Sequence, residues 1–162
     1  MIDNKIKRPS WDEYFIKIAA IVSERSTCHR HHVGAVIVKD KQILTTGYNG
    51  AVKGIKDCLE KGCLRNQLNI ASGTRQEICR AAHAEQNAIV QAANQGININ
   101  NADIYCTHSP CIICAKLIVN SGIKKVCTFN SYADNQFKLL FKEAKIDFVV
   151  LKRPHNEIFL KD

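Results

Sequence analysis

The chain has 162 residues, of which 46% are hydrophobic and 23% are charged, and its formal net charge is +8 at pH 7. This composition predicts a single globular domain over residues 1–162 and excludes a disordered chain. No apolar stretch is long enough to cross a bilayer, and the first residues lack the apolar segment of a signal peptide. We therefore expect a cytoplasmic protein without a membrane partner. The positive charge favours anionic partners, but no basic stripe with interleaved aromatic residues predicts a polynucleotide groove, so we do not expect a nucleic acid partner.

The first half of the chain predicts a helix followed by a β-hairpin. Ser10 and Glu13 form a capping-box pattern at the start of a segment whose apolar residues recur at helical spacing. Residues 33–38 then predict a buried strand, and residues 42–48 predict a second strand that is joined to it by a polar turn. Residues 50–74 show no clear period. An irregular segment of this length inside a compact domain is more often functional than idle.

The second half predicts alternating helices and strands. Apolar residues between Glu77 and Gln95 follow a helical period that Gly96 ends. The elements expected after Gly96 are strand 103–107, helix 110–120, strand 124–129, helix 135–144 and strand 147–151. Their alternation predicts parallel pairing with right-handed crossovers. We therefore expect an α/β fold with a mixed five-stranded central sheet flanked by helices, and a ligand site at the strand ends.

Two short segments carry candidate chemistry, namely His83-Ala84-Glu85 and Pro110-Cys111-Ile112-Ile113-Cys114. H-x-E followed by P-C-x-x-C is the known signature of zinc-dependent deaminases. Ser109 is the expected N-cap of a helix with Pro110 in its first turn, so Cys111 and Cys114 would share one face of that turn. A helix N-terminus favours their thiolate forms. With His83 as the third ligand, one tetrahedral position stays open for water, as in a catalytic zinc site.

His83 and Glu85 pose a geometric problem for this interpretation. Two residues apart on a regular helix, they would point about 200° away from each other. They can share a site only where a helix begins and its geometry is not yet regular. We therefore predict that the main helix begins near His83 and that residues 77–82 belong to a preceding turn.

The predicted roles follow from that arrangement. Zinc lowers the pKa of a bound water, so that hydroxide forms near neutral pH and attacks C4 of a cytosine. Glu85, placed beside the water rather than on the metal, would move the water proton to ring N3 and then to the leaving amine. An isolated C-x-x-C is often half of a structural zinc site or a redox pair, and His-Ala-Glu triplets also arise by chance. Their joint occurrence before two apolar helices favours the deaminase.

Nearly the whole chain resembles the deoxycytidylate (dCMP) deaminase family of the cytidine deaminase-like superfamily. The segments that carry this resemblance are Arg8–Phe15, Val33–Val38, Gly47–Gly50, His83–Ala88 and Ser109–Cys114. The zinc segments are shared across the superfamily, whereas the N-terminal segment and the Gly47–Gly50 turn with its long insertion point to dCMP. The resemblance implies a three-layer α/β/α sandwich that converts dCMP to dUMP for thymidylate synthesis. It also implies activation by dCTP, inhibition by dTTP, and assembly as a homohexamer.

The same resemblance implies a set of substrate-binding residues, namely Asn49, Ala84, Ser109, Tyr132, Arg25 and Ser26. Asn49 would hold the deoxyribose hydroxyl, although Asn-Gly is also the commonest pair in an ordinary hairpin turn. The backbone at Ala84 and Ser109 would border the base. Tyr132 would lie near the base, with an ordinary surface tyrosine as the alternative. Arg25 and Ser26 end the first helix and are candidates for the substrate phosphate.

The remaining cysteines of the eight divide into two groups. In a reducing compartment we expect metal ligation or burial rather than disulfides. Cys106 and Cys127 fall in predicted core strands, so we expect buried thiols. The other group is Cys28, Cys58, Cys63 and Cys79. Some members of the family hold a second, structural zinc in this part of the fold. Our hypothesis is that these four cysteines, or three of them with His31 or His32, form such a closed site; unpaired loop cysteines are the alternative.

Two other functions compete with dCMP deamination. One is another deaminase of the superfamily, such as a tRNA adenosine deaminase, which the basic charge would suit. Such enzymes are generally shorter between the Asn-bearing turn and H-x-E. The other is a non-catalytic, zinc-containing module that binds nucleic acid, which would need neither Glu85 nor an open zinc position.

Overall fold

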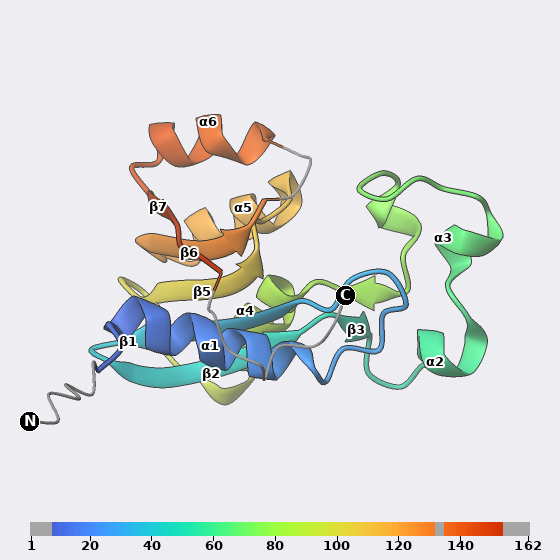
Figure 1. Cartoon of the computed structure of the whole chain (residues 1–162), viewed down its shortest axis with the longest axis horizontal. Helices are drawn as coiled ribbons and strands as arrows, with labels where there is room; N and C mark the ends of the chain where they lie inside the picture. The colour runs from blue at the N-terminus through green and yellow to red at the C-terminus, as the bar shows by residue number, and fades with distance from the viewer. Residues whose placement is uncertain (1–7, 132–134, 154–162) are drawn as a thin grey trace, which may run out of the picture.

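The computed structural model describes residues 8–131 and 135–153, and its centre is a five-stranded sheet (Figure 1). The strands run in the order β2-β1-β5-β6-β7. Their bounds are β1 Gly34–Lys39, β2 Gln42–Tyr48, β5 Asp103–His108, β6 Lys125–Asn130 and β7 Asp147–Val150. β1 is antiparallel to both β2 and β5, whereas β5, β6 and β7 are parallel. The predicted hairpin and the predicted parallel half of the mixed sheet are both confirmed.

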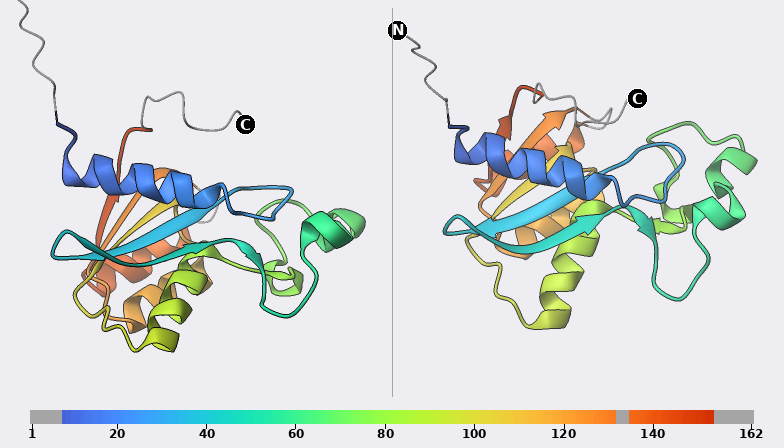
Figure 2. Two further views of the ribbon diagram at one scale, coloured as in Figure 1. Left: turned by 90° about the horizontal axis from the view of Figure 1, so that it is seen from below. Right: turned by 60° about the horizontal axis from the view of Figure 1, so that its bottom comes forward.

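Helices cover both faces of this sheet (Figure 2). α1 (Trp11–Ser23) packs on one face, where its Phe15, Ile16 and Ala19 join a buried cluster with side chains of β1, β5 and β6. α4 (Ala84–Gln95), α5 (Ile112–Asn120) and α6 (Gln136–Glu143) cover the other face. The three-layer sandwich is thus confirmed. Burial on both faces explains why β1 reads as a continuous apolar run rather than an alternating one.

The long irregular segment of the sequence forms an insertion to one side of the sandwich (Figure 1). A two-stranded ribbon of β3 (Gly50–Ala51) and β4 (Ala81–Ala82) closes its base. Two short helices, α2 (Cys58–Lys61) and α3 (Leu64–Gln67), and a 3₁₀ turn at Gln76–Ile78 lie between them. The prediction of irregular structure is therefore only partly right. Among the described residues, no helix has the length and apolarity that a membrane span requires.

Asp12 ties α1 to the sheet through two side chains. The Tyr105 hydroxyl donates to Asp12 Oδ1 at 2.7 Å, and Lys125 Nζ lies 3.0 and 2.9 Å from the two carboxylate oxygens. Because Asp12→Ala would leave both donors without this acceptor, we expect the free energy of unfolding to fall by about 2 kcal/mol. Urea denaturation measures the change. Asp12→Asn, which keeps one acceptor oxygen, should cost less, and an Asp12→Ala protein as stable as wild type would refute the role.

Candidate active site

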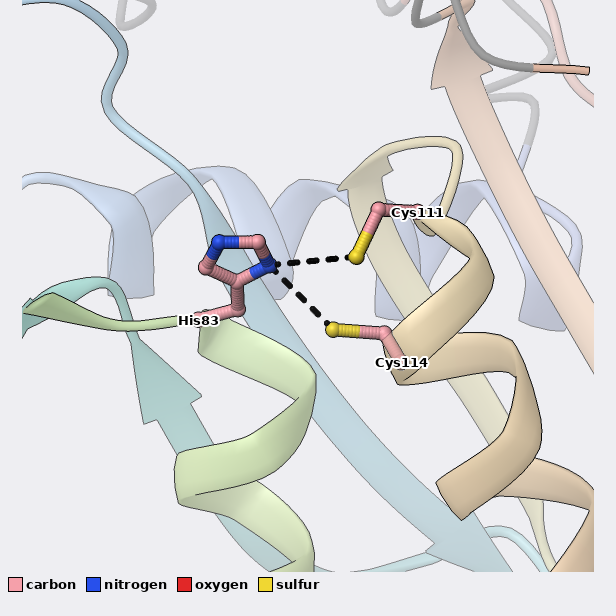
Figure 3. A group of neighbouring side chains, drawn as sticks. All are labelled: His83, Cys111 and Cys114. Atoms are coloured by element: carbon pink, nitrogen blue, oxygen red, sulfur yellow. Dashed lines mark hydrogen bonds between the residues drawn. The ribbon is translucent and has the colours of Figure 1, made fainter. Parts of the chain in front are cut away.

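Three potential metal ligands converge at one point between α4 and α5. His83 Nδ1 lies 3.3 Å from Cys114 Sγ and 3.5 Å from Cys111 Sγ, and the imidazole and both sulfurs point toward one another (Figure 3). Within residues 8–131 and 135–153, this is the one group of three or more such side chains whose ligand atoms all lie within 4.8 Å of one another. One imidazole and two thiols suit zinc, and three protein ligands leave a fourth tetrahedral position for water.

The start of α4 explains how His83 and Glu85 share this site. His83 is the N-cap and has extended backbone angles, φ −76° and ψ 160°, whereas Glu85 is already inside the helix. The side chain of Gln86 fixes this geometry because its Oε1 accepts a hydrogen bond of 2.8 Å from the His83 backbone N–H. The prediction that the main helix begins near His83 is confirmed. The preceding residues form the 3₁₀ turn and the short strand β4, as expected for a segment outside the helix.

The start of α5 differs from the predicted one. Cys111, with φ −73° and ψ 167°, is the N-cap, so the prediction that Ser109 caps the helix and that Pro110 lies in its first turn is wrong. Ser109 instead joins the loop to β6, because its backbone N–H donates to the Asn130 carbonyl at 2.9 Å. Cys111 and Cys114 therefore occupy the N-cap and third helical positions, whose side chains are close together as in a capping box. Both sulfurs remain at a helix N-terminus, where a negative charge is stabilised.

The two thiols influence each other's ionisation. Hydrogen bonds from Cys114 and His83 hold the pKa of Cys111 well below its usual range, and the same sulfur–sulfur contact raises the pKa of Cys114. The pair therefore shares one proton, which a bound cation would displace.

Glu85 is a buried carboxyl group beside this cluster. Its side chain is only 4% exposed, and burial raises its pKa, although the charge of His83 opposes the shift. Cys111 and Cys114 also lie within its electrostatic reach. A buried carboxyl group with a raised pKa next to a metal cluster is suited to accept and release a proton during a reaction.

A cavity of about 740 Å³, which includes space open to solvent, extends from the cluster toward the insertion. Ala84, Ser109 and Asn49, three of the residues predicted to bind a substrate, line it. Arg25 and Ser26 do not line it: Arg25 is exposed, and Ser26 Oγ accepts from the Cys28 backbone N–H. Tyr132 lies outside the described residues.

Asn49 is 8% exposed and occupies the bend between β2 and β3 rather than a hairpin turn. Its Oδ1 accepts from the Val33 N–H at 2.8 Å, and its Nδ2 donates to the His31 carbonyl at 2.8 Å. One amide hydrogen and one lone pair of its side chain take no part in these two bonds. Asn49 is thus held firmly in the cavity wall and keeps capacity for a ligand hydroxyl.

Sequence reasoning did not single out three other residues of the cavity wall, Arg30, Arg65 and His108. His108 is the last residue of β5, and its ring lies 6.1 Å from the ring of His31. Its position at the end of a central strand was the signal that could have identified it. No comparable sequence signal identifies Arg65, because its burial depends on how the insertion folds.

Cys28, from the loop after α1, and the insertion cysteines Cys58, Cys63 and Cys79 also line the cavity. Cys58 and Cys63 are buried, and the other two are half-buried. In the described part of the chain they do not form a set of three or more ligand atoms within 4.8 Å of one another, either alone or with His31 or His32. All eight cysteines are free thiols, and Cys106 and Cys127 are buried as expected.

Gly47 sets the distance between β2 and the helix that begins at the site. A Cβ at this position would lie 2.3 Å from the Ala84 carbonyl oxygen and 2.4 Å from the Ala88 nitrogen, both backbone atoms of α4. We expect Gly47→Ala to displace α4, to lower the free energy of unfolding by about 3 kcal/mol, and to weaken zinc binding at His83.

Thermal unfolding and competition with a zinc chelator measure these two effects of Gly47→Ala. Gly50→Ala, three residues further along the chain, is the matched control, because its Cβ would meet side-chain atoms alone, Thr27 Oγ1 at 3.2 Å and the Tyr48 ring at 3.6 Å. Equal behaviour of the two variants would show that Gly47 does not hold α4 in place.

Comparisons with known proteins agree with this arrangement. Residues 9–130 match the family described as the cytidine and deoxycytidylate deaminase zinc-binding region. The chain is 37% identical to a deoxycytidylate deaminase of Schizosaccharomyces pombe, over 94% of this chain and 47% of the relative. It is 39% identical to ComE operon protein 2 of Bacillus subtilis, over 87% of this chain and 71% of the relative. A deoxycytidylate deaminase of Mycobacterium phage D29 is 40% identical, over 75% of this chain and 95% of the relative.

Solved structures show the same fold. The dCMP deaminase of cyanophage S-TIM5, in complex with dCMP and dUMP, superposes with a TM-score of 0.73 at 32% identity, covering 90% of this chain and 99% of that one. The chain spans about half the length of the two yeast deoxycytidylate deaminases that it matches, 47% and 43%.

Proposed function

Because the chain belongs to the cytidine and deoxycytidylate deaminase family, we propose that it is a zinc-dependent hydrolase that converts dCMP to dUMP and ammonia, and so supplies dUMP for thymidylate synthesis. The observation that carries the proposal is the convergence of His83, Cys111 and Cys114 beside the buried carboxyl group of Glu85. The cyanophage enzyme, with the same fold, is known in complex with dCMP and dUMP, which supports this substrate.

In this proposal, His83, Cys111 and Cys114 would hold one zinc ion. When bound, zinc supplies the Lewis acidity that makes water nucleophilic near neutral pH. Glu85 takes one proton from the attacking water and places it on N3 of the cytosine ring as the water oxygen bonds to C4. It then moves the proton of the resulting C4 hydroxyl to the C4 amine, so that the C4–N bond breaks, ammonia leaves and C4 becomes the carbonyl of dUMP. Its buried position excludes bulk water that would otherwise compete for the proton. Asn49 holds the deoxyribose hydroxyl, and the backbone at Ala84 and Ser109 borders the base, since these three residues line one cavity.

An assay of ammonia release tests the proposed substrate. Zinc-loaded protein is offered dCMP, dCTP, cytidine or a tRNA, and we expect dCMP to be turned over with the highest kcat/KM. Turnover of tRNA alone would overturn the substrate, and no turnover of any of the four would overturn the enzyme.

We also propose that Cys28, Cys58, Cys63 and Cys79 hold a second, structural zinc. Their place on one cavity wall supports this, as does the Arg30 backbone N–H, which donates to Cys28 Sγ at 3.4 Å, a contact that favours a thiolate. Burial raises the pKa of Cys58, and the other three thiols raise it further, so the four groups are electrostatically coupled. A cation would relieve that coupling. Metal analysis should give two zinc ions per wild-type chain and one in Cys58→Ser/Cys63→Ser; one zinc per wild-type chain would eliminate the site.

The oligomeric state and the control of the enzyme by nucleoside triphosphates are the last parts of the proposed function. We propose a cytoplasmic homohexamer that dCTP activates and dTTP inhibits, as the family resemblance implies. Exposed apolar side chains on three helices of one face, Val90 on α4, Ile113 on α5 and Leu139 on α6, support an assembly. Light scattering after size-exclusion chromatography measures the oligomer.

Initial rates with dCMP, with and without each triphosphate, measure the regulation, and rates that neither triphosphate changes would exclude it.

A further inference from the structure

Arg65 is a buried arginine with no carboxylate partner among the residues that the structure describes. It lies in α3 of the insertion and is only 7% exposed. One terminal nitrogen donates to the Ala71 carbonyl at 3.0 Å, whereas its Nε is buried and has no hydrogen-bond partner within residues 8–131 and 135–153. No ion pair among the described residues includes Arg65. Since a buried charge without a counter-charge is costly, such a guanidinium is normally matched by an anion.

Arg30 is a second arginine of the cavity wall, and its side chain is half-buried. Its Nε donates to Asn66 Oδ1 at 2.6 Å and one terminal nitrogen donates to the Ile70 carbonyl at 2.7 Å. The other terminal nitrogen is buried and has no hydrogen-bond partner. Arg30 and Arg65 therefore hold the carbonyls of two successive residues, Ile70 and Ala71. These bonds fix both side chains before any ligand binds, which lowers the entropy cost of binding.

Both arginines line the cavity that also contains Glu85. His31 is another residue of that wall, and burial is the main cause that lowers its pKa. The charges of Arg30 and Arg65 lower the pKa of His31 further, so both arginines act on the same part of the wall. In the described part of the chain, Glu85 is the only carboxylate that lines the cavity, and it lies beside the metal ligands. The cavity thus places one acid at the cluster. It places two guanidinium groups where the loop after α1, which carries Arg30, meets the insertion, which carries Arg65.

We infer that Arg65 and Arg30 bind the 5′-phosphate of the substrate and thereby make this chain select a nucleotide over a nucleoside. Guanidinium groups bind phosphate oxygens through charge-assisted, often bidentate hydrogen bonds, and the unpartnered nitrogens of these two side chains are the donors available for them. This inference rests on the proposed deamination of dCMP. It replaces Arg25 and Ser26, which do not line the cavity, as the candidates for the phosphate.

The test compares dCMP with deoxycytidine, which has the same base and sugar but no phosphate. For Arg65→Gln, we expect kcat/KM for dCMP to fall about 100-fold while kcat/KM for deoxycytidine stays within about threefold of wild type. Arg30→Gln should act in the same direction. Arg65→Lys, which keeps the charge but not the fork of donors, should show a smaller selective loss.

Arg75→Gln is the matched control, because Arg75 lies in the same insertion but its exposed side chain pairs with Glu77 outside the cavity wall. It should leave both substrates unchanged. An equal fall for both substrates in Arg65→Gln, Arg65→Lys and Arg30→Gln would overturn the inference, as would a selective loss of dCMP turnover in Arg25→Gln alone. Failure of the proposed function is distinguishable, since wild type would then deaminate neither dCMP nor deoxycytidine.

Discussion

Replacing Glu85 with glutamine is expected to lower kcat for dCMP by about 10³- to 10⁴-fold, the upper range for loss of a general acid–base group. Glutamine matches the shape of the buried side chain and can orient a water molecule, but it cannot carry a proton from water to N3 and then to the amine. The zinc content should stay at the wild-type value, because Glu85 is not one of the converging ligands. Ammonia release and metal analysis on the same preparation measure both quantities.

The control for this variant is Glu143→Gln, an equivalent change at an exposed position at the end of α6. It should change kcat by less than about twofold, as expected for a charge remote from the reacting atoms. Wild-type rates in Glu85→Gln would reject Glu85 as the proton carrier. Loss of zinc together with activity would instead assign Glu85 to the metal site.

Cys114→Ser is expected to abolish both zinc binding at the site and turnover of dCMP. Cys114 is fully buried in the first turn of α5, and its sulfur lies 3.3 Å from His83 Nδ1. A serine hydroxyl is a much weaker zinc ligand than a thiolate. Loss of a residue that only supports a ligand lowers metal affinity by up to about 100-fold, so we expect loss of the ligand itself to lower zinc affinity by more than that. Competition with a chromophoric chelator measures the affinity.

Cys127→Ala is the matched control, since Cys127 is equally buried but lies in β6, outside the group of His83, Cys111 and Cys114. This variant should lose some stability and keep its zinc. If Cys114→Ser binds zinc at this site as tightly as Cys127→Ala, then Cys114 is not a ligand.

The sandwich could be predicted from sequence because its strands are buried on both faces and its helices are amphipathic over several turns. Residues 103–107 predict β5 to within one residue, for example. The insertion could not be predicted in the same way. α2 and α3 have four residues each, which is too short for a helical period to show. Their positions depend on contacts such as those of Arg30 with Asn66 and Ile70, which are distant in sequence.

The candidate site was predictable where chemistry restricts the residue types. The metal site needs histidine and cysteine side chains at fixed spacings, which His83, Cys111 and Cys114 provide. The requirement that Glu85 share their site correctly predicts where α4 begins. Local preference failed at Ser109, where cap propensity favours serine but the hydrogen bond to Asn130 keeps this residue in the loop. Local preference also gives no sign of Arg30, because it is the path of the chain after α1 that brings this residue to the cavity wall.

Removal and restoration of zinc test the central claim most directly. The protein is treated with a chelator, assayed for ammonia release from dCMP, and assayed again after zinc is returned. The account predicts that turnover disappears with the metal and recovers to the untreated rate when zinc is restored. Undiminished deamination by protein shown to contain no metal would contradict it.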